Sequence, residues 1–168
     1  MNERSDIEAA ETAPANAASP RNVHASVVSV GGEGILIRGR SRSGKSALAL
    51  SLLRRAELLG IESALVGDDQ VFLERKGNSL FAVAPATIRG LIEVSGIGII
   101  EERFVDRAKV TLVVDLLEHE AIARMPATAT ETLHGVSLRR IVLPERQASF
   151  GADVLQGLAM RSTHRKTP

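Results

Sequence analysis

Residues 39–46 read GRSRSGKS and stand between the apolar run ILIR at 35–38 and the segment ALALSLL at 47–53. The octapeptide matches the pattern G-x-x-x-x-G-K-[ST] at every fixed position. It also lies between a predicted strand and a predicted helix, the context in which this pattern binds phosphate. Glycines let backbone N–H groups curl around phosphate oxygens at the positive end of a helix. The stretch therefore predicts a nucleotide-binding loop in an α/β domain.

Every residue of this loop is a candidate nucleotide ligand: Gly39, Arg40, Ser41, Arg42, Ser43, Gly44, Lys45 and Ser46. Lys45 would place a positive charge at the β- and γ-phosphates of ATP, and the Ser46 hydroxyl would ligate Mg²⁺. Two arginines are unusual inside such a loop, and Arg42 stands where a smaller residue is easier to accommodate. We therefore expect an altered nucleotide affinity.

The composition limits the class of protein. The chain has 168 residues, a net charge of +1, 2% aromatic residues and no Cys. This length predicts about one domain. The near-neutral charge and the few aromatic rings argue against a nucleic-acid partner. No apolar run approaches the ~20 residues that span a bilayer, and the lack of Cys fits a reducing compartment. We expect a cytoplasmic protein with no nucleic-acid and no membrane partner.

Hydrophobic spacing predicts a mixed sheet with helices. Strands are expected at 27–30, 35–38, 61–66, 71–75, 80–84, 109–116 and 138–143, and helices at 45–59, about 85–93 and 152–160. The first helix should bury Leu48, Leu52, Ala56 and Leu59 and be capped by Gly60. Strands mixed with helices and at least two hairpins indicate an α/β domain with a mixed sheet.

The two ends of the chain differ from its middle. Residues 1–20 are polar and Ala-rich, which predicts a flexible tail, and residues 161–168 form a short basic tail. The catalytic domain is therefore expected at 21–160.

Two places could supply an acidic residue for magnesium or for catalysis. Asp68 and Asp69 follow the predicted strand at 61–66, although adjacent carboxylates there are also common in turns and caps. The run at 110–115, VTLVVD, is an apolar strand that ends in Asp115, as in the magnesium-binding strand of many phosphate-loop enzymes. The pattern alone favours Asp115, and both assignments stay open.

The motifs around the loop together resemble the catalytic domain of HPr kinase/phosphorylase, over about residues 22–160. That family has a His-Gly before its phosphate loop, an Ala-Asp-Asp motif, and a signature close to Glu-Ile-Arg-Gly-Leu-Gly-Ile-Ile. Here these read His24-Ala25, Gly67-Asp68-Asp69 and, at 93–100, EVSGIGII. The resemblance implies a P-loop kinase domain with a nucleotide-binding fold like that of phosphoenolpyruvate carboxykinase. It also implies a short form without the N-terminal domain of longer members, and a homo-oligomer, usually a hexamer.

The same resemblance implies a serine kinase that uses ATP and Mg²⁺. Its acceptor would be HPr, the small phosphocarrier of the bacterial sugar phosphotransferase system, or a homologue. Many members reverse the reaction with inorganic phosphate. Two alternatives stay open: a P-loop kinase or NTPase of small substrates that uses Asp115 for magnesium, and a nucleotide-sensing regulator that transfers no phosphate.

Residue roles follow from the resemblance position by position. Asp69 matches the proton acceptor, which one group can serve in both directions of the reaction. His24, Lys45 and Arg124 match catalytic positions. Ser46 and Glu93 match magnesium ligands, with Asp68 beside them as a further ligand.

The sequence also departs from the family. Ala47 replaces an acidic residue after the loop serine, and Ser95 replaces the arginine of the signature. Residues 101–109 stand where longer members have a Gly-Ala-rich segment, and residues 144–149, PERQAS, are all that remains of the region used for phosphorolysis. The sequence therefore favours kinase activity over phosphorylase activity.

Overall fold

The computed structural model describes residues 21–126 and 129–164. The tail predicted at 1–20 and the last residues of the predicted basic tail, 165–168, lie outside the described residues. The α-helices in this part of the chain are α1 (Lys45–Leu58) and α2 (Ala148–His164), with short 3-10 turns η1 (Ala86–Ile88) and η2 (His119–Ala121).

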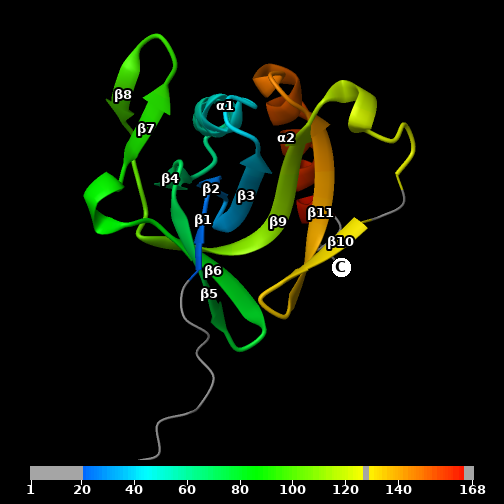
Figure 1. Ribbon diagram of the computed structural model, residues 1–168, viewed down its shortest axis with the longest axis horizontal. Helices are drawn as coiled ribbons and strands as arrows, with labels where there is room; N and C mark the ends of the chain where they lie inside the picture. Colours follow the sequence, from blue (N-terminus) through cyan, green and yellow to red (C-terminus); the bar gives the residue numbers. More distant parts are fainter. Residues whose placement is uncertain (1–20, 127–128, 165–168) are drawn as a thin grey trace, which may run out of the picture.

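A large mixed sheet forms the body of the domain (Figure 1). Its strands are β1 (Arg21–Val23), β2 (Ser26–Val30), β3 (Glu33–Gly39), β4 (Ser63–Gly67), β5 (Val71–Lys76), β6 (Ser79–Val83), β9 (Arg107–Leu117), β10 (Ala129–Leu133) and β11 (Val136–Pro144). A separate hairpin, β7 (Leu91–Val94) and β8 (Gly98–Glu101), stands apart and extends in the opposite direction from the β5–β6 hairpin.

Strand β9 connects the two parts of the main sheet. Its first residues pair antiparallel with β6, and its later residues lie parallel between β3 and β11. The register between β3 and β9 shifts near Gly34, which allows the long strand to change direction. The phosphate loop follows β3, so its position is fixed by a strand paired on both sides.

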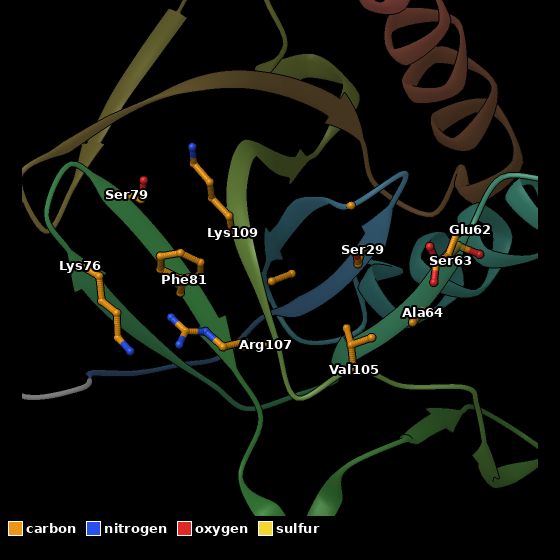
Figure 2. Close-up of a pocket in the computed structure, with 12 residues that line it drawn as sticks. Ser29, Glu62, Ser63, Ala64, Lys76, Ser79, Phe81, Val105, Arg107 and Lys109 are labelled. Carbon is orange, nitrogen blue, oxygen red and sulfur yellow. The ribbon is translucent and has the colours of Figure 1, made fainter.

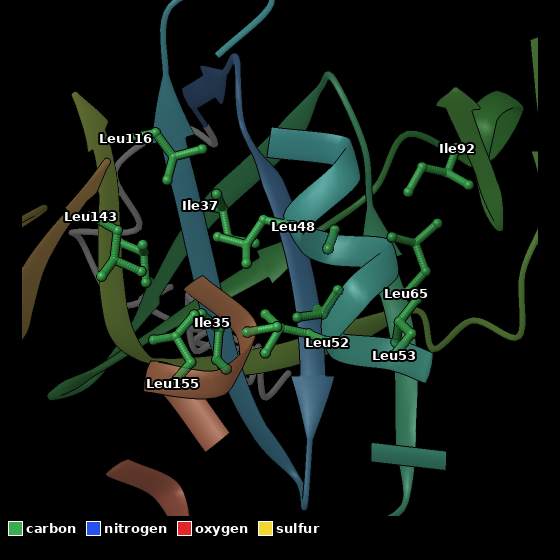
Figure 3. Close-up of a cluster of buried hydrophobic side chains, with 14 residues drawn as sticks. Ile35, Ile37, Leu48, Leu52, Leu53, Leu65, Ile92, Leu116, Leu143 and Leu155 are labelled. Atoms are coloured by element: carbon green, nitrogen blue, oxygen red, sulfur yellow. The ribbon is translucent and has the colours of Figure 1, made fainter. Parts of the chain in front are cut away.

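The sheet separates two hydrophobic cores. One core packs α1 and α2 against the sheet and includes Ile37, Leu48 and Leu155 (Figure 3). The other core lies on the opposite face, inside the curl of the sheet, and includes Leu36 and Leu80. Leu36 and Ile37 are adjacent and face opposite cores because successive strand residues alternate between faces. Burial of each such side chain stabilises the fold by about 1.5–3 kcal/mol.

The strand, loop and helix predicted around the phosphate loop are confirmed. The β2–β3 hairpin and the start of α1 at Lys45 lie where the sequence placed them. Gly60 has φ of +66° and ends the helix, with the N–H of Ile61 donating to the carbonyl of Ala56. The prediction for Leu59 is wrong: it lies beyond the last helical residue and is 50% exposed.

The helix predicted at 85–93 is also wrong. Only the short turn η1 forms there, and β7 replaces the rest of the predicted helix. The reason is Gly90, whose φ of +70° ends the helical backbone and whose missing Cβ leaves room for Phe104. Pairing with the β-branched residues Ile99 and Ile100 then makes the following segment a strand.

Other boundaries moved or were missed. Helix α2 begins at Ala148 and ends at His164, so it starts earlier than the predicted 152–160 and includes residues 161–164 of the predicted tail. Strands β1 and β10 were not predicted. Strand β1 depends on β5, a partner distant in the sequence. Strand β10 pairs with the adjacent β11, but its residues, ATETL, are mostly polar and give a weak strand pattern.

Candidate active site

The phosphate loop connects β3 to α1. Gly44 adopts the left-handed conformation, with φ of +95°, and its carbonyl accepts the first hydrogen bond of α1 from the N–H of Leu48 at 2.9 Å. A Cβ on Gly39 would lie 2.5 Å from Ser43 Oγ, so only glycine fits there. The arrangement directs the free N–H groups of the helix N-terminus toward the loop, which is a favourable environment for an anion.

A chain of polar contacts runs from the loop to Asp69. Lys45 is only 6% exposed, and its Nζ donates to the carbonyls of Gly39 and Arg40, both at 3.1 Å. The same Nζ lies 3.0 Å from His24 Nε2, and His24 Nδ1 lies 2.9 Å from Asp69 Oδ1. Lysine offers donors only, so Nε2 accepts, and Nδ1 carries the hydrogen that points to Asp69. This series of contacts fixes both the tautomer of His24 and the position of the Asp69 carboxylate.

Burial changes the acid–base properties of the loop lysine. Desolvation lowers the pKa of Lys45 below its usual value, while the negative charges of Asp68 and Asp69 act in the opposite direction. Asp69 itself is 61% exposed and has φ of +66°, which places its carboxylate at the surface of the site.

Asp68 is the centre of a second set of contacts. It is 4% exposed and accepts hydrogen bonds from Ser26 Oγ at 2.5 Å and from the backbone N–H of Glu93 at 3.2 Å. Ser46 Oγ lies 2.9 and 3.0 Å from its two oxygens. Residues from β2, α1 and β7 therefore meet at this carboxylate. Ser26 was not predicted as part of the site, because a serine inside a strand gives no signal of its own.

The structure does not bring all predicted residues into these contacts. The backbone of Glu93 contacts Asp68, and its side chain is exposed on β7. Arg124 is exposed after η2, and within residues 21–126 and 129–164 its side chain makes no hydrogen bond or ion pair. No group of three His, Asp or Glu side chains suited to a metal occurs in the described part of the chain.

Asp115 lies in a different environment. It alternates along β9 with Val114, which belongs to the core beneath α1, so its side chain is on the other face of the sheet. Arg38 donates to its two oxygens at 2.7 and 2.9 Å, and Arg140 donates at 2.5 Å. Burial acts to raise the pKa of Asp115, but the hydrogen bonds from Arg38 and Arg140 outweigh it and the pKa is lowered. Both arginines also pair with Glu131.

The side chain of Arg40 is paired outside the loop. Its Nε and Nη2 donate to the Glu145 carboxylate at 3.0 and 2.8 Å, and Nη2 lies 2.6 Å from Glu118 Oε1. The hydrogen bond with Glu145 raises the pKa of Arg40 and, from the other side, lowers the pKa of Glu145. Arg42 is exposed, with φ of +62°. The partners of Arg40 follow it by more than 70 positions and were not predicted.

A groove of about 830 Å³ lies at the end of β3 that is distant from the phosphate loop (Figure 2). Arg107 stacks over the ring of Phe81, 4.1 Å from its centroid, and Lys76 and Lys109 line the same groove. Figure 2 shows these two lysines pointing away from each other. Their charges do not converge on one point, and the groove is not part of the loop site.

Comparisons with known proteins connect this geometry to a family. A family model described as the HPr serine kinase C-terminal domain matches residues 15–167. The chain belongs to this family. Its α/β fold with a mixed sheet also resembles a solved structure of the Hpr(Ser) kinase/phosphatase from Coxiella burnetii, with a TM-score of 0.72 and 26% identity over 85% of this chain and 99% of that one.

Two curated relatives in this family are called HPr kinase/phosphorylase. The protein from Chloroherpeton thalassium is 38% identical over 136 residues, which are 74% of this chain and 38% of the relative. The protein from Alkaliphilus metalliredigens is 28% identical over 156 residues, which are 86% of this chain and 48% of the relative. The chain spans less than half the length of these relatives. No helix in the described residues is long and apolar enough to cross a membrane.

Membership of the HPr serine kinase C-terminal domain family confirms the resemblance that the motifs indicated. The α/β prediction is confirmed with it. The roles of the individual residues remain predictions. The contacts among His24, Lys45 and Asp69 and between Ser46 and Asp68 give these five a physical basis to be tested.

Proposed function

We propose that this domain transfers the γ-phosphoryl group of ATP to a serine hydroxyl of HPr or a closely related phosphocarrier, in regulation of the bacterial phosphotransferase system. The observation that carries the proposal is the chain of contacts from Asp69 through His24 to Lys45. It joins an exposed carboxylate, suited to accept a proton, to the lysine of a phosphate-binding loop. The names of the relatives support the same acceptor.

In the proposed reaction, the serine oxygen forms a bond to the γ-phosphorus while the bond between that phosphorus and the bridging oxygen of ADP breaks. The serine proton passes to Asp69, which acts as general base. His24 keeps the carboxylate in place through its Nδ1–H. Lys45 and the backbone amides of residues 39–46 offset the negative charge of the phosphates.

The residues beside the loop fit a magnesium ion. Ser46 Oγ and the Asp68 carboxylate are within 3.0 Å of each other and are the hard oxygen ligands that Mg²⁺ prefers. Mg²⁺, when bound there, would offset the negative charge of the phosphates. Glu93 is proposed as a further ligand and Arg124 as a residue that neutralises charge on the transferring group.

We also propose a cytoplasmic location, because ATP is the phosphoryl donor, and assembly as a homo-oligomer, hexameric by resemblance to the family. Sedimentation equilibrium measures the number of subunits directly. The relatives' name also includes a phosphorylase; in that reverse reaction Asp69 would return the proton to serine.

A phosphotransfer assay tests the proposed function. Protein mixed with Mg-ATP and purified HPr should produce phosphoserine. Asp69→Asn should bind Mg-ATP with nearly unchanged affinity in calorimetry, while the rate of transfer falls by on the order of a thousandfold. Asp153→Asn is the matched control, since Asp153 is an exposed aspartate on α2 paired with Arg55.

The other functions give different results in the same experiments. Full transfer by Asp69→Asn and none by Asp115→Asn would favour the kinase or NTPase of small substrates. Binding of Mg-ATP without transfer to any acceptor would favour the nucleotide-sensing regulator.

A further inference from the structure

The segment at 144–147, between β11 and α2, lies directly against the phosphate loop. The backbone N–H of Arg146 donates to the carbonyl of Ser43 at 2.8 Å. A Cβ on Gly44 would lie 3.3 Å from that same nitrogen, so the two backbones are in close contact. The second half of the loop is therefore attached to this segment by main-chain contacts.

The first half of the loop is attached to the same segment by a side chain. Arg40 forms a two-pronged pair with the carboxylate of Glu145, whose side chain is only 9% exposed. A guanidinium and a carboxylate in this geometry fix each other's orientation as well as their distance. Glu118 adds a second, exposed carboxylate on the same Nη2.

Glu145 is in turn anchored to the sheet. Its backbone N–H donates to the carbonyl of Leu117, the last residue of β9, at 2.8 Å. At the other end of the contact, the carbonyl of Arg40 accepts a hydrogen bond from Lys45 Nζ at 3.1 Å. A continuous path of hydrogen bonds therefore runs from the end of β9, through Glu145 and Arg40, to the lysine that would hold the phosphates.

We infer that segment 144–147 is a brace for the phosphate loop, and that Arg40 is a positioning residue that joins the loop to this brace through Glu145. The inference rests on the proposed nucleotide binding and adds a function for an arginine that the motif leaves unexplained. Arg40 acts on the loop conformation through the carboxylates of Glu145 and Glu118, and the loop amides and Lys45 contact the phosphates.

The charge of Glu145 makes this inference testable by the sign of an effect. A carboxylate near a triphosphate repels it, so simple electrostatics predicts that Glu145→Gln binds Mg-ATP more tightly. The brace predicts that Glu145→Gln binds Mg-ATP more weakly, because the loop loses the partner that fixes Arg40. If Arg40 contacted phosphate directly, Glu145→Gln would free it and would also tighten binding.

Calorimetry with Mg-ATP and with Mg-ADP decides between these outcomes. We expect Arg40→Gln and Glu145→Gln each to raise the Kd by about three- to tenfold, the range for losing a partly exposed charged hydrogen-bonded pair. The double variant should be no weaker than the worse single variant, because both remove the same contact. Arg40→Lys keeps the positive charge but cannot form the two-pronged pair with Glu145, so its Kd should lie between those of the wild type and Arg40→Gln. The KM for ATP should rise more than kcat falls.

Arg103→Gln is the matched control. Arg103 also forms an exposed ion pair, with Glu62, at the end of the molecule distant from the loop. Its variant should bind Mg-ATP like the wild type.

Unchanged or tighter binding by Glu145→Gln, with normal binding and transfer by the wild type, would overturn the brace alone. A wild-type protein that binds no Mg-ATP would overturn the proposed function and the brace together. If Arg40→Gln does not fold, which its melting curve reveals, the sign of the Glu145→Gln effect still decides.

Discussion

Asp68 follows β4 and Asp115 lies near the end of β9, the two strands on either side of the β2–β3 pair, yet their surroundings are opposite. Asp68 is contacted by two hydroxyls and a backbone N–H, all neutral donors. Asp115 is contacted by two guanidinium groups. A carboxylate whose charge is already neutralised by arginines has little to offer a metal ion, whereas one held by neutral donors keeps its negative charge for it. The partners of an aspartate, more than the strand pattern before it, decide what it can do.

The largest expected effect comes from removing the charge of Asp68. Asp68→Asn should reduce phosphoryl transfer by on the order of a thousandfold, because Ser46 would lose the carboxylate that completes the proposed magnesium site. The measurement is the initial rate of phosphoserine formation over a magnesium titration, with a melting curve to verify folding. If Asp68→Asn transfers at the wild-type rate, Asp68 has no role in phosphoryl transfer.

A change at Asp115 should affect stability and leave the chemistry nearly intact. Asp115→Asn leaves Arg38 and Arg140 with one carboxylate, Glu131, between them, and we expect the free energy of unfolding to fall by about 2 kcal/mol. Urea denaturation gives this value. Transfer by the folded variant should stay within about threefold of the wild type. Loss of magnesium-dependent transfer would instead restore the interpretation of Asp115 as a metal ligand.

The smallest effect is expected in acid. The pKa of Asp115 is lower in the folded protein than in the unfolded chain, where it has its ordinary value of 3.8. Its ion pairs therefore contribute stability above about pH 4, and this contribution is lost as the pH falls through the folded pKa. Denaturation curves from pH 6 to pH 3 should show a shallower loss of stability for Asp115→Asn than for the wild type. Parallel curves would mean that the arginines do not stabilise the charged carboxylate.

The sequence was most informative where contacts are short in range. The strand, loop and helix around residues 39–46 were predicted with their order and nearly with their bounds, because glycine conformations and helix spacing are local properties. The same reasoning failed at 85–93, where one glycine and a neighbouring strand override helical spacing. His24 and Asp69 were each identified by resemblance, but their contact with one another was not predicted.

The sequence by itself determined that the chain has a phosphate loop at the start of a helix, in an α/β domain with family motifs around it. Only the tertiary structure decided which carboxylates are free and which are paired. Asp68 meets Ser26 and Ser46, Asp115 meets Arg38 and Arg140, and Arg40 meets Glu145. Each of these pairs is brought together by folding from positions more than 20 residues apart, and a charge acts through the distance to its neighbours in space rather than through its place in the chain.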